Sequence, residues 1–284
     1  MKLIVDSGST KANWCFAGQS GERVILDTDG INPAIQTRQS IRSILVQQLI
    51  PQVGDKNVSL DSVDDVFFYG AGCMPQTKSL VSDELCDIMK QNVKVHVESD
   101  LLGAARALCG RRAGIAAILG TGANSCFYDG EDIVEHTPAL GYILGDEGSG
   151  AVLGRLFLNA VLKGKLSAKV SRDFFAVTGY TEQDIIERVY HSETPSKFLA
   201  SMSRFIFERI GCAELENMVI DNFISFIKAN ILPYSDAPKV INAVGSIAYY
   251  YKPQLMQAAD YFGYNIGNIA KSPISLMVDY HMNN

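Results

Sequence analysis

The feature that most constrains the fold of this chain is a strand-turn-strand pattern that occurs twice, at residues 3–16 and 116–128. In each copy an apolar run ends in a turn rich in glycine, serine and threonine, and a second apolar run follows. Turns of this composition expose backbone N–H groups and hydroxyls, which are donors that bind phosphate oxygens. Two such turns facing each other would form a phosphate clamp.

The length of the chain and the order of its apolar segments predict a two-domain α/β protein. Of its 284 residues 47% are hydrophobic, which supplies enough apolar surface for two modest cores. In the first half, strands are expected near residues 2–6, 12–17, 22–27, 65–69 and 93–97, and helices near 37–50, 77–91 and 99–109. This alternation indicates an α/β layer structure, and the hairpin at its start makes the sheet mixed.

The domain boundary is expected at residues 111–114, which separate a helix from the second copy of the strand-turn-strand pattern. The predicted domains are therefore residues 1–110 and 111–270. The second domain is expected to be enriched in helices, with a helical insertion at about 148–232 that serves a structural purpose.

The end of the chain is predicted to return to α/β structure. Strands are expected near residues 239–244 and 264–269. Pro273 suits the first turn of a last helix at about 271–284. We expect this helix to pack back on the first domain.

Composition and charge argue against several classes of protein. The 25 basic and 31 acidic residues give a formal net charge of -6, so no broad cationic face is expected for a nucleic acid backbone. No apolar run is long enough to cross a membrane, and Asp6 interrupts the N-terminal run before it could form a signal peptide core. We therefore expect a cytoplasmic protein that binds neither nucleic acid nor membrane.

The six cysteines lie far apart in the sequence and form no CxxC pair. Most of them sit in apolar sequence, which fits reduced and packed thiols better than disulfides or zinc ligands. Metal binding through sulfur is therefore a weak hypothesis.

The first turn has the side chains of a phosphate site. Gly8 lets the backbone approach a ligand, Ser9 and Thr10 add hydroxyl donors, and Lys11 adds a cation. Asp6, at the end of the preceding strand, is placed to hold Mg²⁺ through water. An ordinary hairpin turn explains the same residues equally well, because Ser-Gly-Ser sequences favour turns.

Two other glycine pairs do not form a dinucleotide site. Gly120 and Gly122 resemble the start of a Rossmann motif, but that motif needs a helix directly after it, and residues 125–128 are predicted to form a strand. The sequence around residues 70–72 has Pro75 in place of the third glycine, so a tight strand-to-helix connection is the better interpretation.

Asp100 is the candidate general base. It stands where a predicted strand, residues 93–97, gives way to a helix, and this edge of an α/β sheet is a usual place for a ligand site. The alternative is purely structural, because an acid beside a Ser99 cap is stabilised by the helix dipole alone.

Together these segments resemble a known superfamily. The two turns, residues 98–106, residues 141–150 and residues 243–248 are similar, in this order, to the motifs of the sugar kinase/Hsp70/actin superfamily. Within it the chain resembles the BadF/BadG/BcrA/BcrD ATPase family, on the branch of N-acetylglucosamine kinase. The resemblance covers nearly the whole chain and implies two actin-like (ribonuclease H-like) domains with mixed sheets around a nucleotide cleft.

The resemblance also implies cofactors and a nucleotide site. The expected cofactors are ATP and Mg²⁺, with the magnesium bridging the nucleotide phosphates. Expected ATP-binding residues are Gly8, Ser9, Thr10, Lys11, Thr121, Gly122, Gly245 and Ser246, of which the last two would lie against the adenosine. Relatives of this kind are commonly dimers, so a homodimer is expected.

By the same resemblance, Asp100 would accept the proton of the C6 hydroxyl of an amino sugar, N-acetylglucosamine or glucosamine. The residues expected to bind the sugar's hydroxyls and amide are Asn32, Gly122, Asn124 and Asp146. Each also has a structural interpretation: Asn32 precedes a proline in a turn, and Asp146 suits a helix cap. The three glycines 148, 150 and 154 indicate close approach of a helix to the nucleotide or to the neighbouring sheet.

The chain departs from the family pattern in two places. Ala12 follows Lys11, where many relatives carry a hydroxyl residue, and this weakens the case for a further phosphate contact there. The residues after Asn32 are Pro33-Ala34-Ile35, without the aromatic residue of the animal N-acetylglucosamine kinases. Specificity for the acyl group is therefore open.

Two alternative functions remain open at this point. One is the iron-sulfur ATPase that activates 2-hydroxyacyl-CoA dehydratases, which needs closely placed thiolates at a subunit junction. Near Asp100 the sequence offers a single cysteine, Cys109, which argues against it. The other is a nucleotide or sugar sensor without turnover, and the joint presence of Asp6, Asp100 and Asp146 argues against that.

Overall fold

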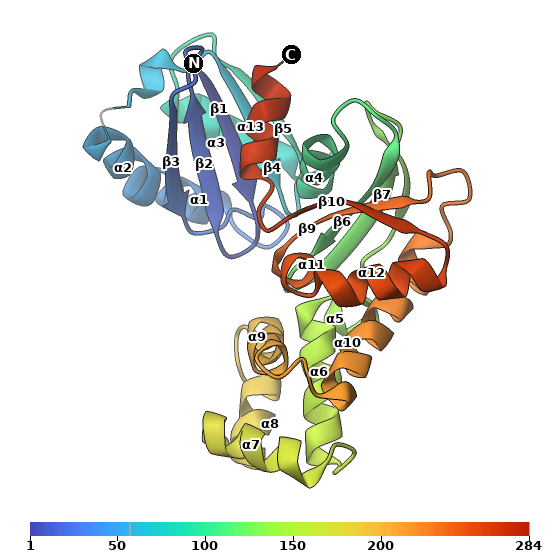
Figure 1. Cartoon of the computed structure of the whole chain (residues 1–284). Coiled ribbons are helices and arrows are strands. Elements are labelled where there is room, and N and C mark those ends of the chain that lie inside the picture. The colour runs from blue at the N-terminus through green and yellow to red at the C-terminus, as the bar shows by residue number, and fades with distance from the viewer. Residues whose placement is uncertain (57, 284) are drawn as a thin grey trace. The chain divides into compact units, whose positions relative to one another are not determined.

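A computed structural model describes residues 1–56 and 58–283 of the chain (Figure 1). The chain divides into two compact units. Unit 1 comprises residues 1–111 together with the C-terminal segment that begins at Ser272, and unit 2 comprises residues 112–271.

Unit 1 is built on a mixed five-stranded sheet. Its strands are β1 (Lys2–Ser7), β2 (Ala12–Ala17), β3 (Arg23–Thr28), β4 (Asp65–Gly70) and β5 (Lys94–Ser99), in the order β3-β2-β1-β4-β5. The hairpin pairs β1–β2 and β2–β3 are antiparallel, whereas β1–β4 and β4–β5 are parallel. The sheet is mixed as the sequence predicts, and each strand lies within two residues of its expected position.

Helices connect β3 to β4 and β4 to β5, and further helices follow β5 and end the unit. They are α1 (Arg38–Ile44), which continues through the π-helical turn η1 (Leu45–Leu49) into α2 (Ile50–Asp55), the 3₁₀ turn η2 (Leu60–Ser62), α3 (Lys78–Ile88), α4 (Asp100–Cys109) and α13 (Ile274–Met282). α1 begins after Thr37, whose hydroxyl accepts from the Ser40 N–H at 3.2 Å.

Both faces of the unit 1 sheet are covered, as the alternation along β1 shows. Leu3 and Val5 pack with the cluster that includes residues of α1, η1 and α3, whereas Ile4 points to the other face. There it packs with Met277 and Val278 of α13. The last helix therefore completes the core of the unit in which the chain begins.

Unit 2 repeats the same sheet topology. Its strands are β6 (Gly114–Leu119), β7 (Ala123–Tyr128), β8 (Ile133–Thr137), β9 (Val240–Val244) and β10 (Asn265–Ala270), in the order β10-β9-β6-β7-β8. The pairs β6–β7 and β7–β8 are antiparallel, and β6–β9 and β9–β10 are parallel. Counted from its hairpin, each sheet has the same connections, so the repeated strand-turn-strand pattern marks a repeated fold. β8 was not expected from the sequence.

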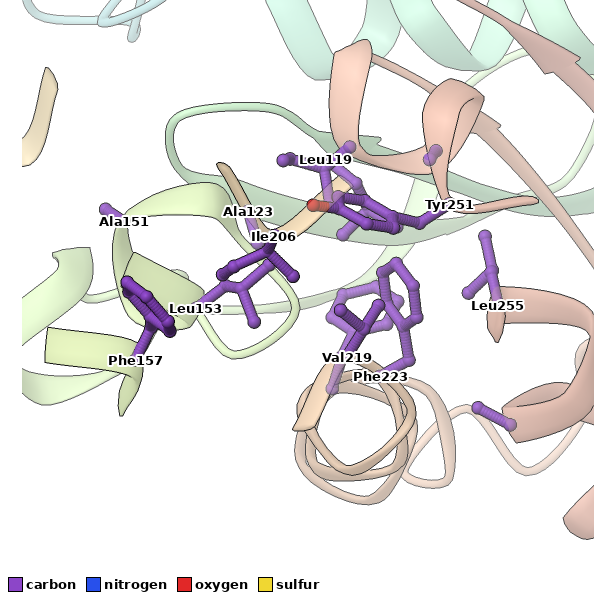
Figure 2. Packing of buried hydrophobic residues seen from close by; sticks show 14 of the residues in the cluster. Leu119, Ala123, Ala151, Leu153, Phe157, Ile206, Val219, Phe223, Tyr251 and Leu255 are labelled. Atoms are coloured by element: carbon purple, nitrogen blue, oxygen red, sulfur yellow. The ribbon is translucent and has the colours of Figure 1, made fainter. Parts of the chain in front are cut away.

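Unit 2 differs from unit 1 in its many helices. They are α5 (Gly141–Leu144), α6 (Gly150–Leu162), α7 (Ala168–Thr178), α8 (Glu182–Tyr190), α9 (Pro195–Phe207), α10 (Ala213–Phe226), the π-helical turn η3 (Ile227–Ile231), α11 (Ser246–Tyr250) and α12 (Lys252–Tyr261). Figure 2 shows Val219 and Phe223, one turn apart on α10, near Tyr251 and Leu255. This spacing is the buried stripe of an amphipathic helix.

The glycines at the start of α6 serve close packing in more than one direction. A Cβ at Gly154 would overlap the backbone of Leu199, so this glycine lets α6 approach α9. Gly148 has a φ of 83° and packs against Phe226. The expectation that these glycines face the nucleotide or the sheet is therefore wrong for Gly154, which faces a helix.

Six free thiols and no membrane-length helix are found in the described residues. Cys15, Cys73, Cys109 and Cys126 are buried, and Cys86 and Cys212 are at least partly exposed. In residues 1–56 and 58–283 no helix combines the length and the apolar character that a bilayer span needs.

Candidate active site

The first turn, residues 8–11, joins β1 to β2 and carries polar groups at the surface. The Gly8 N–H donates to the Lys11 carbonyl at 3.0 Å and closes the turn. Ser9 and Thr10 form its tip, and their side chains are exposed. Hydroxyls and N–H groups at such a tip are accessible to phosphate oxygens.

Gly30, which follows β3, supports the first turn. A Cβ at this position would overlap the Gly8 carbonyl oxygen and lie 2.5 Å from the Thr10 nitrogen. The next residue, Ile31, is held by the buried Ser7 hydroxyl, which accepts from the Ile31 N–H at 2.8 Å and donates to its carbonyl at 3.1 Å. Sequence reasoning missed Gly30, because only the folded chain brings it under the turn.

Asn32, expected to be a sugar ligand, uses both ends of its side-chain amide within the protein. Its Nδ2 donates to the Ser9 hydroxyl at 2.8 Å, and its Oδ1 accepts from the Ala34 N–H at 3.0 Å. The backbone N–H of Asn32 donates to the Gln36 side chain at 2.8 Å. In this arrangement the Asn32 amide orients the Ser9 hydroxyl. To bind a sugar directly, the amide must release its hydrogen bond to Ser9 or to Ala34.

Asp100 is the first residue of α4, directly after the end of β5. Ser99 caps this helix, because its hydroxyl accepts from the Leu102 N–H at 3.2 Å. The Asp100 Oδ1 accepts from the Leu101 N–H at 2.9 Å. Burial raises the pKa of Asp100 to about 6, although the bond from Leu101 acts in the opposite direction. A carboxylate with this pKa is largely ionised at neutral pH and can still accept a proton.

Asp6, on β1, lies close enough to Asp100 for their charges to interact. Burial, and after it the negative charge of Asp100, raise the pKa of Asp6 to about 7. Within the described part of the chain, no group of three or more His, Cys, Asp or Glu side chains could hold a metal. The pair Asp6 and Asp100 fits Mg²⁺, because this ion is usually held by one or two carboxylates together with substrate phosphates.

Lys11 forms an ion pair with Asp27 of β3. The Lys11 Nζ lies 2.9 Å from Asp27 Oδ2, and both side chains are more than half exposed. An exposed pair of this kind contributes little to stability. The ammonium group can therefore leave Asp27 for a phosphate at small cost.

The second turn, residues 120–122, joins β6 to β7 and is held by the main chain of α6. The Gly150 N–H donates to the Gly120 carbonyl at 2.8 Å. The Ala151 N–H donates to the Thr121 carbonyl at 3.1 Å. These bonds fix the turn through its carbonyls, and the Thr121 side chain stays exposed.

Asp146 places its carboxylate against the second turn. A Cβ at Gly122 would lie 3.0 Å from the Asp146 Oδ2. Burial raises the pKa of Asp146 to about 6; hydrogen bonds from the Ala123 and Gly141 backbones oppose this, and the charge of Glu147 adds to it. The structure therefore gives the second turn a carboxylate from a separate loop.

Ser149 and Asn222 hold the loop that contains Asp146, and sequence reasoning missed both. Ser149 is the cap of α6, because its hydroxyl accepts from the Val152 N–H at 3.1 Å. The Asn222 Oδ1 accepts from the Gly148 N–H at 3.1 Å, and its Nδ2 donates to the Ser149 carbonyl at 3.3 Å. Asn222 is a buried polar residue within the apolar stripe of α10, and this break in the pattern is a signal that could have found it.

Asn124, on β7, is oriented by two hydrogen bonds to its side-chain carbonyl. The Asn124 Oδ1 accepts from the Ser125 N–H at 3.0 Å and lies 2.9 Å from the His136 Nε2. His136 belongs to β8, the strand that the sequence did not reveal.

Gly245 and Ser246 lie at the start of α11, against the base of the second turn. Gly245 has a φ of 116°, and a Cβ there would overlap the carbonyl oxygen of Leu119. The Gly245 N–H donates to the Ala270 carbonyl at 3.0 Å. Glycine is needed here for both its conformation and its close approach to the backbone.

The expected site residues thus form two groups. Unit 1 contains Asp6, Gly8, Ser9, Thr10, Lys11, Asn32 and Asp100. Unit 2 contains Thr121, Gly122, Asn124, Asp146, Gly245 and Ser246.

Solved structures share this architecture, although no family model matches the chain. A protein of Porphyromonas gingivalis, described as a candidate N-acetylglucosamine kinase, is 41% identical, with a TM-score of 0.95 over 100% of this chain and 99% of that chain. A second candidate N-acetylglucosamine kinase, from Chromobacterium violaceum, has a TM-score of 0.73 over 98% of each chain. At 14% identity it shows the fold alone.

The duplicated sheet and its two turns define an actin-like ATPase fold, within the sugar kinase/Hsp70/actin superfamily. The chain belongs to the N-acetylglucosamine kinase-like family, because its 41% identity to the Porphyromonas gingivalis protein extends over nearly the full length of both. A curated relative, the N-acetylmuramic acid/N-acetylglucosamine kinase of Clostridium acetobutylicum, is 26% identical over 178 residues. That match spans 60% of this chain and 57% of the relative.

Proposed function

We propose that this protein is an ATP-dependent kinase that phosphorylates the C6 hydroxyl of an amino sugar, N-acetylglucosamine or glucosamine. The names of the relatives from Porphyromonas gingivalis and Clostridium acetobutylicum support the substrate class. The observation that carries the proposal is the position of Asp100, a partly buried acid at the start of α4 that interacts with Asp6 in the unit that holds the first turn.

In the proposed reaction Asp100 is the general base. Its pKa of about 6 leaves it ionised at pH 7, so it accepts the hydroxyl proton as the sugar oxygen bonds to the γ-phosphorus of ATP. The bond from that phosphorus to the β–γ bridging oxygen breaks, and ADP leaves. Positioning and charge neutralisation supply the rest of the rate.

In this proposal each unit contributes phosphate ligands from its own turn. The first turn supplies the Ser9 and Thr10 hydroxyls and the Lys11 ammonium group, which exchanges Asp27 for a phosphate. The second turn supplies Thr121 and the backbone at Gly122, and Gly245 and Ser246 contact the adenosine. Asp6 would hold Mg²⁺ through water, and the ion, when bound, would neutralise charge on the phosphates.

The sugar is bound mainly by groups of unit 2. Asp146 offers a carboxylate and Asn124 an amide beside Gly122, and such fixed acceptors and donors match the hydroxyls of a sugar. Leaving one of these groups unpaired costs on the order of 1–3 kcal/mol, which gives the site its selectivity. Asn32 contributes from unit 1, either directly or through the Ser9 hydroxyl that it orients.

We also propose that the protein works as a homodimer in the cytoplasm. The support is the resemblance to a family whose members are commonly dimers. Light scattering of the purified protein tests the dimer, because a mass of one chain contradicts it.

The decisive test is ADP release with magnesium-ATP and a panel of sugars: N-acetylglucosamine, glucosamine, N-acetylmannosamine and glucose. We expect an amino sugar to stimulate release. Asp100→Asn should keep sugar binding and lose turnover by about 10²–10⁴-fold, the usual contribution of a general base. Near-normal turnover in that variant removes the base assignment.

The same experiment separates the alternatives. No stimulation by any sugar would favour a sensor, and a brown purified protein would favour the iron-sulfur activator. Asp129→Asn is the matched control, because Asp129 accepts N–H bonds in the turn after β7 and has no place in the proposed site.

A further inference from the structure

The C-terminal helix α13 lies against α4 and against the β1–β2 hairpin within unit 1 (Figure 1). α4 begins with Asp100, whereas α13 ends the chain. We propose that α13 positions Asp100 for catalysis. A hydrogen-bond relay from His281 through Tyr69 to Arg106 carries this effect, and close packing at Gly103 supports it. The inference rests on the proposed kinase function and makes Tyr69 and His281 positioning residues.

Gly103 brings three elements into contact one helical turn after Asp100. A Cβ at Gly103 would lie 2.5 Å from the Met277 Cε and 2.6 Å from the Tyr69 Cγ. The missing side chain therefore lets α13 and β4 approach the backbone of α4. Glycine in a helix interior costs roughly 0.5–1 kcal/mol relative to alanine, so close packing is a physical reason for its presence here.

The relay joins the far end of α4 to the far end of α13. The Arg106 Nη1 donates to the Tyr69 hydroxyl at 3.0 Å. That hydroxyl lies 2.9 Å from the His281 Nε2; this second bond is buried, and the bond from Arg106 is partly buried. Because a guanidinium has no acceptor, the Tyr69 oxygen accepts from Arg106, and its one proton is available to His281. We assign His281 Nε2 as the acceptor of this proton, which places the ring proton on Nδ1.

A neutral His281 agrees with its surroundings. Burial, followed by the positive charge of Arg106 and of other nearby groups, lowers the pKa of His281 to about 3. The Phe67 ring stacks on the imidazole with a centroid distance of 3.8 Å and fixes its plane. The charged or titratable groups around His281 are Lys2, Tyr69, His96, Arg106, Arg111 and Tyr280.

The consequence for Asp100 follows from the stiffness of a short helix. α4 is held at its start by the Ser99 cap, in its middle at Gly103 and near its end at Arg106. Without His281 to orient it, the Tyr69 hydroxyl no longer holds Arg106 in place. The displacement at this end of α4 then reaches Asp100, because a short helix is stiff. A misplacement of about 1 Å can cost about 10²-fold in rate, whereas ground-state binding by other residues is unaffected.

Two substitutions at His281 test the relay. Glutamine can place its Oε1 near the position of Nε2 and accept from Tyr69, but asparagine is one methylene shorter and cannot reach. We expect H281Q to keep most of the wild-type kcat, and H281N to lose about tenfold in kcat while KM for ATP and sugar changes by less than about twofold. Tyr69→Phe, which keeps the ring and removes the hydroxyl, should show the same loss.

The controls separate this inference from the function on which it rests. His191→Asn changes an exposed histidine at the end of α8 and should leave kcat unchanged. Equal kcat values in the two His281 variants, or wild-type kcat in Tyr69→Phe, overturn the relay even if thermal stability falls. If H281N does not fold, Tyr69→Phe decides. A failure of the function itself is visible in the wild type, which would release no ADP with any amino sugar.

Discussion

Units 1 and 2 have the same sheet topology but place their charges differently. In unit 1 the acid Asp6 lies on the central strand β1, and the cation Lys11 belongs to the turn itself. In unit 2 the turn is the neutral sequence Gly-Thr-Gly, and its carboxylate, Asp146, comes from a loop outside the hairpin. The two units therefore share a fold but differ in the charged groups at their turns.

The two turns are also supported differently. Side chains hold the first turn, because Asn32 bonds to Ser9 and Lys11 is paired with Asp27. The main chain of α6 holds the second turn through hydrogen bonds to the carbonyls of Gly120 and Thr121. Side-chain contacts can exchange for a ligand, whereas backbone bonds to a helix stay. The difference indicates an adaptable turn in unit 1 and a rigid one in unit 2.

The largest effects on the free energy of unfolding are expected when alanine replaces Gly245 or Gly30, the glycines that pack behind the second and the first turn. Comparing the two variants tests whether the second turn is the more rigid. Gly245→Ala adds a Cβ against the Leu119 backbone and forces a φ of 116° on alanine. We expect a loss on the order of 3–5 kcal/mol in the free energy of unfolding, measured with denaturant. Gly30→Ala meets backbone atoms of the first turn without a φ penalty and should lose on the order of 1–3 kcal/mol.

Gly263→Ala is the matched control. Its φ of 72° is also left-handed, but a Cβ there meets open space, so we expect a loss of about 1–2 kcal/mol. A Gly245→Ala variant no less stable than Gly263→Ala would contradict the close contact behind the second turn.

The pH dependence of the rate tests whether both units contribute an acid. Asp100 and Asp146 each have a pKa raised to about 6, so each loses its charge as the pH falls through this value. We expect kcat to fall about tenfold per pH unit well below pH 6, because Asp100 must be ionised. With both acids required, kcat/KM should fall more steeply than kcat. Parallel profiles would remove Asp146 from sugar binding.

Asp6→Asn should stabilise the protein at neutral pH. The folded pKa of Asp6 is about 7, above its usual value, so ionisation disfavours the folded state progressively from about pH 4 to pH 7. We expect a gain on the order of 1–2 kcal/mol in the free energy of unfolding at pH 8 and almost none at pH 4. The measurement is a denaturant titration at both pH values, without nucleotide or metal.

Asp129→Asn is the control, and its expected effect on the free energy of unfolding has the opposite sign. The backbone N–H groups of Asp132 and Glu131 lower the pKa of Asp129, so its contribution to stability is present at neutral pH and disappears in acid. The variant should be less stable than wild type at pH 7. A gain in both variants would mean that general charge repulsion, and not the local site, sets the effect of Asp6.

The smallest effect is expected for Lys11→Gln. The Lys11–Asp27 pair is exposed, so the free energy of unfolding should change by less than about 0.5 kcal/mol. Arg204→Gln, which removes an exposed pair with Glu208 in unit 2, is the comparison. A loss above about 1 kcal/mol for Lys11→Gln would show that the first turn depends on this ion pair.

Much of the fold could be predicted because its elements have local signals. The hairpin strands and the helices α3 and α4 lie close to their expected positions, since apolar runs and turn residues identify them. β8 was missed because Ile133–Thr137 is partly exposed, with Glu135 and His136 in place of an apolar run. Edge strands of this kind carry little hydrophobic signal.

For the candidate site, the sequence points to residues whose chemistry is local and misses residues that depend on distant contacts. The first turn and Asp100 stand out because glycine, hydroxyl and acidic residues follow strands directly. Gly30 and His281 contact segments far away in the sequence, and no spacing rule reveals them. Asn222 also makes distant contacts, and its only local signal is the break in the apolar stripe of α10. The hydrogen bonds of Asn32 are likewise set by the folded turn, and its expected role toward sugar stays a prediction.

The position of α13 has a consequence for biosynthesis. The first sheet leaves the ribosome before all of unit 2, yet the helix that covers one of its faces is made after unit 2. At a usual translation rate the roughly 160 intervening residues take about 10–30 s, and during this time Ile4 and its neighbours lack their cover. The nascent chain therefore exposes this apolar face until α13 has been synthesised, and a stop codon before α13 would leave the face uncovered.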